Sequence, residues 1–109
     1  MGITQPRPYI PDVVALAASV DSTGLPLDGG TFPPIIKSIA IDGESFLVTL
    51  NRPLPRRDYV WFVQSRTPAL TEISQDDAAG LVHRVEIKRP SDYSGFLTPF
   101  HLLVIGAPL

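Results

Sequence analysis

The chain has no cysteine among its 109 residues. This absence excludes a disulfide framework, a zinc site built on thiolates and a cysteine nucleophile. Charge is also scarce, because Asp, Glu, Lys and Arg make up 18% of the residues against a usual share of about 25%. The hydrophobic share is 44%, and a short chain this poor in charge has more apolar surface than one small core readily absorbs. We therefore expect the protein to associate with partners or with copies of itself.

The sequence also lacks a basic excess, a long apolar run and a secretory signal. Its formal net charge is −2, whereas nucleic-acid binders need a basic face to displace counterions from phosphate. No apolar run approaches the roughly 20 residues of a membrane-spanning helix. The first residues lack the basic and apolar regions of a secretory signal. We therefore expect synthesis in the cytoplasm, with no nucleic-acid partner and no membrane.

Motifs for catalysis, metal binding or a cofactor are missing as well. His83 and His101 lie in apolar strand patterns without a His-x-His or His-Glu-x-x-His motif, so both are interpreted as core or edge residues. No Gly-x-Ser-x-Gly elbow marks a nucleophile, and the glycine pair at 29–30 lacks the Gly-Lys-Ser/Thr of a phosphate loop. The sequence thus predicts a non-enzyme with no catalytic, cofactor-binding or metal-binding residues.

What the chain does contain is a series of short apolar segments with the period of β-strands. The clearest stretch runs from residue 35 to 64 as strand, turn, strand, corner and strand. Asp42-Gly43 lies at its first turn and predicts a hairpin with a type I′ turn. Apolar side chains at every second position share one face of an extended chain. In this hairpin they are Ile39, Ile41, Phe46, Val48 and Leu50.

The remaining segments extend this β pattern. Residues 13–20 fit both helical and strand spacing, and the turn cluster that follows favours a strand. A short helical turn is expected over 71–79. Residues 81–88 alternate regularly, and residues 96–105 are almost wholly apolar, so the last strand is expected to be central or covered. Together they predict an all-β fold, a small β-sandwich or barrel of the Ig-like or jelly-roll-like kind.

Residues 1–12 predict an extended, proline-rich N-terminal arm, followed by a single β domain over 13–109. Three prolines in the first eleven residues exclude a helix and regular strand pairing there. Tyr9 and Ile10 are apolar and would anchor the arm, either on a neighbouring subunit or on its own domain.

A proline-marked corner supplies a second candidate contact site. Arg52, Arg56 and Arg57 concentrate positive charge there. Arginine can bind a carboxylate of a neighbouring subunit through two hydrogen bonds. The alternative is a solvated corner, because exposed charge pairs contribute little to stability.

The segment that follows, residues 59–64, is apolar on both faces. Tyr59 and Trp61 fall on one face, and Val60 and Phe62 fall on the other. Such a strand either lies between two packed layers or contributes to a subunit interface. We predict that Phe62 belongs to the core, whereas Trp61 is either a core residue or an anchor for a partner.

The layout of the whole chain resembles that of small structural proteins of tailed bacteriophages. The resemblance rests on the cysteine-free β domain, the proline-rich arm, the turn-rich stretch over 25–34 and the apolar C-terminus. It is similar to capsid decoration (cement) proteins and to tail or fibre accessory proteins. The resemblance implies a non-catalytic virion protein, made in the host cytoplasm, that binds between shell subunits and stabilises the particle. It also implies a homo-oligomer, with a trimer as one arrangement.

Two other functions fit the same sequence. A carbohydrate- or receptor-binding module of a tail or fibre would use Tyr59, Trp61 or Tyr93 to stack on a sugar ring. A small enzyme would need a pocket of converging polar groups, which no motif predicts. Binding to glycans and the mass of the native assembly would separate these alternatives.

Overall fold

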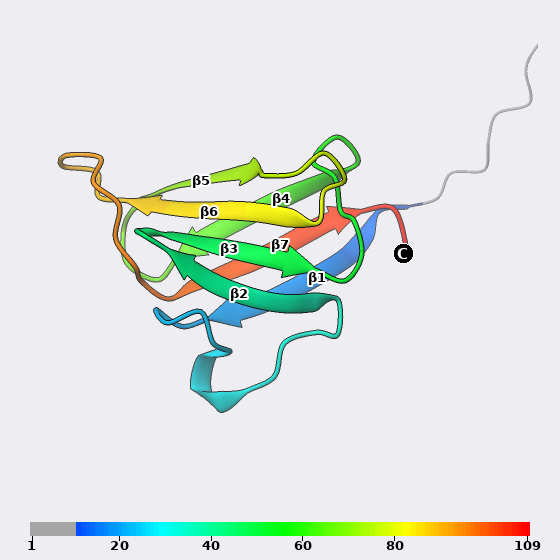
Figure 1. Ribbon diagram of the computed structural model, residues 1–109, viewed down its shortest axis with the longest axis horizontal. Coiled ribbons are helices and arrows are strands. Elements are labelled where there is room, and N and C mark those ends of the chain that lie inside the picture. Colours follow the sequence, from blue (N-terminus) through cyan, green and yellow to red (C-terminus); the bar gives the residue numbers. More distant parts are fainter. Residues whose placement is uncertain (1–10) are drawn as a thin grey trace, which may run out of the picture.

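The computed structural model describes residues 11–109 as an all-β fold of two antiparallel sheets (Figure 1). The strands are β1 (Val13–Val20), β2 (Ile36–Asp42), β3 (Ser45–Leu50), β4 (Tyr59–Ser65), β5 (Leu70–Gln75), β6 (Val82–Lys88) and β7 (Phe100–Gly106). A short 3-10 turn, η1 (Leu27–Gly29), lies between β1 and β2. Most of the predicted arm, including Tyr9 and Ile10, lies outside the described residues.

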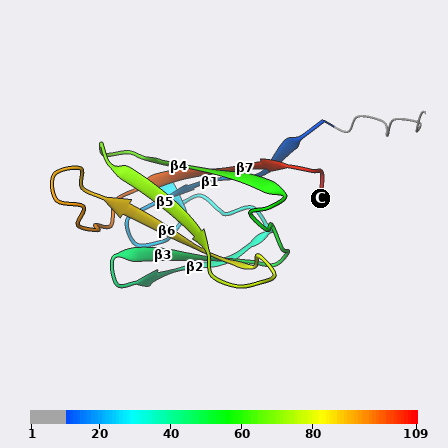
Figure 2. The ribbon, with the colours of Figure 1, turned by 90° about the horizontal axis from the view of Figure 1, so that it is seen from above.

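The strands form two layers. Sheet A has the strand order β1-β7-β4, and sheet B has the order β2-β3-β6-β5. Figure 2 shows β1, β4 and β7 in one layer and β2 and β3 in the other, as in a β-sandwich. The strand predicted over 13–20 is confirmed as β1, and β7 is confirmed as the central strand of its sheet.

The core lies between the inner faces of the two sheets. Leu16, Val104 and Trp61 align across sheet A, and all three side chains are buried. Phe46 of β3 packs against Phe100 of β7, with ring centroids 4.8 Å apart and planes tilted by 55°. Because β3 belongs to sheet B and β7 to sheet A, this aromatic contact joins the two layers.

The hairpin predicted around residue 43 is confirmed. Ile39 lies opposite Val48, and Ile41 lies opposite Phe46, so these apolar side chains share a face as their spacing predicts. Ile41 remains 39% exposed because β2 is an edge strand of sheet B.

The turn of this hairpin differs from its prediction. Asp42 pairs with Ser45, so the loop consists of Gly43 and Glu44 rather than of Asp42 and Gly43. In residues 11–109, Asp28 and Tyr93 are the non-glycine residues with positive φ, and Gly43 has φ +63°. A positive φ at only the first loop residue is the pattern of a type II′ turn, so the type I′ prediction is wrong.

The helical turn predicted over 71–79 is also wrong, since residues 70–75 form β5. Thr71 pairs with Ile87 and Ile73 pairs with Val85 of β6. Cross-strand hydrogen bonds satisfy this backbone, whereas an isolated helical turn of the same length is marginal. The last strand begins at Phe100 rather than at residue 96, because Pro99 cannot donate a ladder hydrogen bond.

The prediction that Phe62 belongs to the core is wrong as well. β4 is an edge strand of sheet A, and its Trp61 points inward with 7% exposure. Phe62 points outward and is 52% exposed. Alternation along a strand separates two faces but does not say which face is covered, and sheet B covers only the face that carries Trp61.

Candidate functional site

The outer face of sheet A is the side that points away from sheet B. Three rows of residues, aligned across the strands by their register, make up this face. The rows are Val14, Ile105 and Val60, then Ala17, Leu103 and Phe62, then Ser19, His101 and Gln64. Two rows are wholly apolar, and the third is polar and forms one end of the face.

This face exposes large apolar side chains in contact with solvent. Val14 is 58% exposed, Val60 is 55% exposed and Phe62 is 52% exposed. The strands β1, β4 and β7 contain no Asp, Glu, Lys or Arg. Apolar patches of this kind, when they are contiguous, mark sites of interaction. The lack of charged residues in these three segments is the sequence signal that could have indicated the face, but one segment alone was not enough to indicate it.

The outer face of sheet B has the opposite character. Arg84 lies 2.9 Å from a carboxylate oxygen of Asp42 and 3.1 Å from one of Asp76. Lys88 lies 3.4 Å from a carboxylate oxygen of Glu72. The sandwich therefore has one charged outer face, suited to water, and one neutral apolar face.

The polar row contains a serine and a histidine in contact. A hydrogen bond of 2.8 Å joins Ser19 Oγ and His101 Nδ1 across β1 and β7. Both residues border an open hollow of about 460 Å³, which Leu27 and Thr31 also line. Among residues 11–109, no carboxylate hydrogen-bonds the His101 ring, so the pair lacks the group that orients the base in a nucleophilic triad. We therefore interpret it as the polar end of the outer face.

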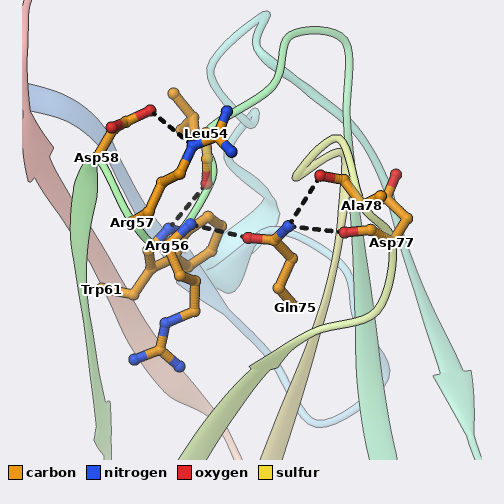
Figure 3. Close-up of polar contacts among 8 residues, drawn as sticks. All are labelled: Leu54, Arg56, Arg57, Asp58, Trp61, Gln75, Asp77 and Ala78. Atoms are coloured by element: carbon orange, nitrogen blue, oxygen red, sulfur yellow. Dashed lines mark hydrogen bonds and ion pairs between the residues drawn. The ribbon is translucent and has the colours of Figure 1, made fainter.

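Trp61, a candidate anchor from the sequence, lies in the core. Its indole N–H donates to the Leu54 carbonyl over 3.3 Å (Figure 3), and its ring stacks on His83 with centroids 3.9 Å apart. With 7% exposure it offers no surface on which a sugar or a partner can stack. Tyr59, on the same side of β4, is half-buried beside Gly106.

The three arginines of the corner do not converge on one site. Arg56 is bound within the chain, because its backbone N–H donates to Gln75 Oε1 over 2.8 Å and its guanidinium donates to the Ile73 carbonyl. Arg57 points in another direction, 3.5 Å from the Asp58 carboxylate (Figure 3). Arg52 is exposed. Arg56 therefore fixes the corner to β5, and Arg52 and Arg57 remain at the surface.

No family model, curated protein or solved structure matches this chain. In residues 11–109 no three His, Cys, Asp or Glu side chains gather as metal ligands would. Nothing helical in this part of the chain is long and apolar enough to pass through a bilayer.

One titratable group is enclosed in the core. The His83 side chain is fully buried, and its Nε2 lies 2.9 Å from the Gly80 carbonyl. Since a carbonyl only accepts, Nε2 carries the proton, and Nδ1 has no hydrogen-bond partner within residues 11–109. Burial lowers the pKa of His83 below its usual 6.5, and the Gly80 contact and the Asp77 carboxylate oppose this shift in part.

We expect this histidine to make the fold sensitive to acid. Because the folded state disfavours the protonated ring, the free energy of unfolding should be level above the usual histidine pKa of about 6.5 and should fall as pH decreases below it. Urea denaturation between about pH 7 and pH 4.5 measures this slope. Asp21, Asp77 and Asp92 also have lowered pKa values, but their contribution is lost mainly below about pH 5, at the acid end of this window.

The matched control is His83→Phe, which keeps a ring against Trp61 but cannot titrate. This variant should lose the slope between about pH 7 and pH 5. An unchanged slope in His83→Phe would assign the acid sensitivity to another group.

Proposed function

We propose that this protein is a non-catalytic structural module that docks on neighbouring protein subunits through the outer face of sheet A. The observation that carries the proposal is the combination of exposed Val14, Val60 and Phe62 with strands free of charged residues. The cores of protein interfaces are depleted in charge and enriched in aromatic side chains. Phe62 would be the aromatic anchor of such an interface.

The assembly that we propose is a virus particle. In this proposal the protein is a capsid decoration protein, or a tail accessory protein, that binds between shell subunits and adds buried area to their contacts. Its support is the resemblance in layout described above together with the neutral outer face. Association would reduce the exposure of Val14 and Phe62, and the charged face of sheet B would remain toward solvent.

Replacement of Phe62 by lysine tests this function. Phe62→Lys places a charge in the middle row of the outer face, so we expect its binding to the native particle to weaken at least about 100-fold. Co-sedimentation of the protein with particles stripped of it measures the binding. Ser74→Lys is the control, since Ser74 is exposed on β5 of sheet B. Equal binding of Phe62→Lys and Ser74→Lys would contradict docking through this face.

A carbohydrate-binding function is the second candidate, and one observation favours it. Tyr93 is 67% exposed and has φ +59°, a left-handed conformation that non-glycine residues rarely adopt. Strained residues of this kind cluster at binding sites. Asp92 Oδ1 accepts hydrogen bonds from the Ser94 backbone N–H and hydroxyl at 3.0 and 2.7 Å, which fixes the loop. Glycan binding that Tyr93→Ala abolishes, with the fold intact, would favour this alternative.

A further inference from the structure

We propose that a second copy of this chain occupies the outer face of sheet A, with the two copies related by a two-fold axis roughly parallel to β7. This inference rests on the proposed function, because it names a second copy of this chain as the neighbouring subunit that docks on the same face. A two-fold axis in this direction, lying between two facing sheets, brings β7 over β7 of the second copy. It also brings β4 of each copy over β1 of the other.

The register of sheet A makes this pairing complementary in size. Ala17, Leu103 and Phe62 form one row, with β7 in the middle. Under the axis, the large Phe62 of each copy lies over the small Ala17 of the other, and Leu103 lies over its own equivalent. Large side chains over small ones let facing layers interdigitate. Phe62 would thus fill the space that Ala17 leaves open.

The neighbouring rows also match under the same axis. Val14 lies over Val60, and Ile105 lies over Ile105, so apolar meets apolar. Ser19 lies over Gln64, so the polar row meets itself. A two-fold axis across the strands, centred on the Phe62 row, would instead place the row of Val14, Ile105 and Val60 over the polar row.

The same axis also accounts for the usual angle between packed sheets. Strands of two packed sheets cross at about 30°, and a two-fold axis tilted by about 15° from β7 produces this angle.

Charge allows two copies to meet here. Each copy has a formal net charge of −2, so identical charged surfaces would repel each other. The strands of sheet A contain no Asp, Glu, Lys or Arg, and the ion pairs of Arg84 and Lys88 lie on sheet B. Two copies can therefore pair through the outer face of sheet A, because its strands carry no like charges that would repel each other.

The size of the face sets the expected strength of pairing. Its exposed side chains offer on the order of 500 Å² per copy, so a pair buries on the order of 1,000 Å², the lower limit for a specific interface. We therefore expect a dissociation constant in the micromolar range rather than a permanent dimer.

Sedimentation equilibrium of the full chain at a series of concentrations tests the pairing. We expect a monomer–dimer equilibrium that Phe62→Lys and Ala17→Glu each weaken at least about 100-fold, because each buries an unpaired charge twice by symmetry. Ser74→Lys should leave the equilibrium unchanged. Circular dichroism checks that the variants fold.

Mixing the single variants tests the axis. Phe62→Lys and Ala17→Glu, each monomeric alone, should form a 1:1 heterodimer, because the new lysine of one copy then faces the new glutamate of the other. Val14→Glu mixed with Phe62→Lys is the control and should stay monomeric, since Val14 lies over Val60. If both mixtures form heterodimer to the same extent, or if the wild-type chain forms a trimer, the two-fold arrangement is overturned.

The outcomes also separate this inference from the function on which it rests. A wild-type chain that stays monomeric at millimolar concentration overturns self-pairing. If that monomer still binds its native particle and Phe62→Lys prevents binding, docking through the face stands and its occupant is another protein. If Phe62→Lys affects neither measurement, both proposals fail.

Discussion

Replacing Phe46 by alanine is expected to lower the free energy of unfolding by about 3–5 kcal/mol, the usual cost of a large cavity in a core. The Phe46 ring is fully buried, and it contacts the Phe100 ring with centroids 4.8 Å apart. Because this contact joins sheets A and B, neither sheet can refill the space without moving the other. Urea denaturation followed by tryptophan fluorescence measures the change, since the only Trp is buried in the core.

The matched control for this prediction is the same substitution on the outer face. Phe62 is 52% exposed, so Phe62→Ala in dilute protein should cost about 1 kcal/mol or less, mainly in strand propensity. Losses of similar size for Phe46→Ala and Phe62→Ala would contradict the assignment of Phe46 to the core and of Phe62 to the surface.

Gly80→Ala is expected to destabilise the fold by about 2–4 kcal/mol, from a strained backbone and from overpacking. Gly80 has φ +83°, and a Cβ there would lie 2.6 Å from the Cα of Pro55. That neighbour is backbone and cannot rotate away. The Gly80 carbonyl also accepts a hydrogen bond from the Leu54 N–H over 3.0 Å and lies 2.9 Å from His83 Nε2, so a displacement would weaken both contacts.

Gly43→Ala separates the two causes. Gly43 has φ +63°, but a Cβ there would meet no atom within 4 Å. This variant should therefore show only the cost of the positive φ, about 1 kcal/mol. Chemical denaturation of both variants gives the comparison. If Gly80→Ala lowers the free energy of unfolding no more than Gly43→Ala does, the close approach of Pro55 does not contribute to the destabilisation.

Much of the fold follows from alternation along the sequence. The hairpin around residue 43 and the burial of His83 and Val85 on β6 follow from a period of two. The central place of β7 follows from its nearly continuous apolar sequence. These features depend on residues close together in the chain, where spacing alone fixes which side chains share a face.

The features that sequence reasoning missed depend on pairing between distant segments. Residues 70–75 become a strand because β6 supplies their partners, and the hairpin turn shifts by one residue because Asp42 pairs with Ser45. Phe62 is exposed because sheet B covers only one side of β4. The outer face itself combines β1, β4 and β7, which are far apart in the sequence, and only the sheet order brings them together.

The most direct test of the outer face is its accessibility in the assembled protein. Because the chain has no cysteine, a single thiol introduced by Ala17→Cys reports on the middle row of this face, and Ser74→Cys reports on sheet B. The rate of maleimide labelling is measured in dilute protein and in the native assembly. We expect assembly to slow labelling severalfold at position 17 and to leave position 74 unchanged. Labelling at position 17 that is equally fast in both states would contradict an interface on the outer face of sheet A.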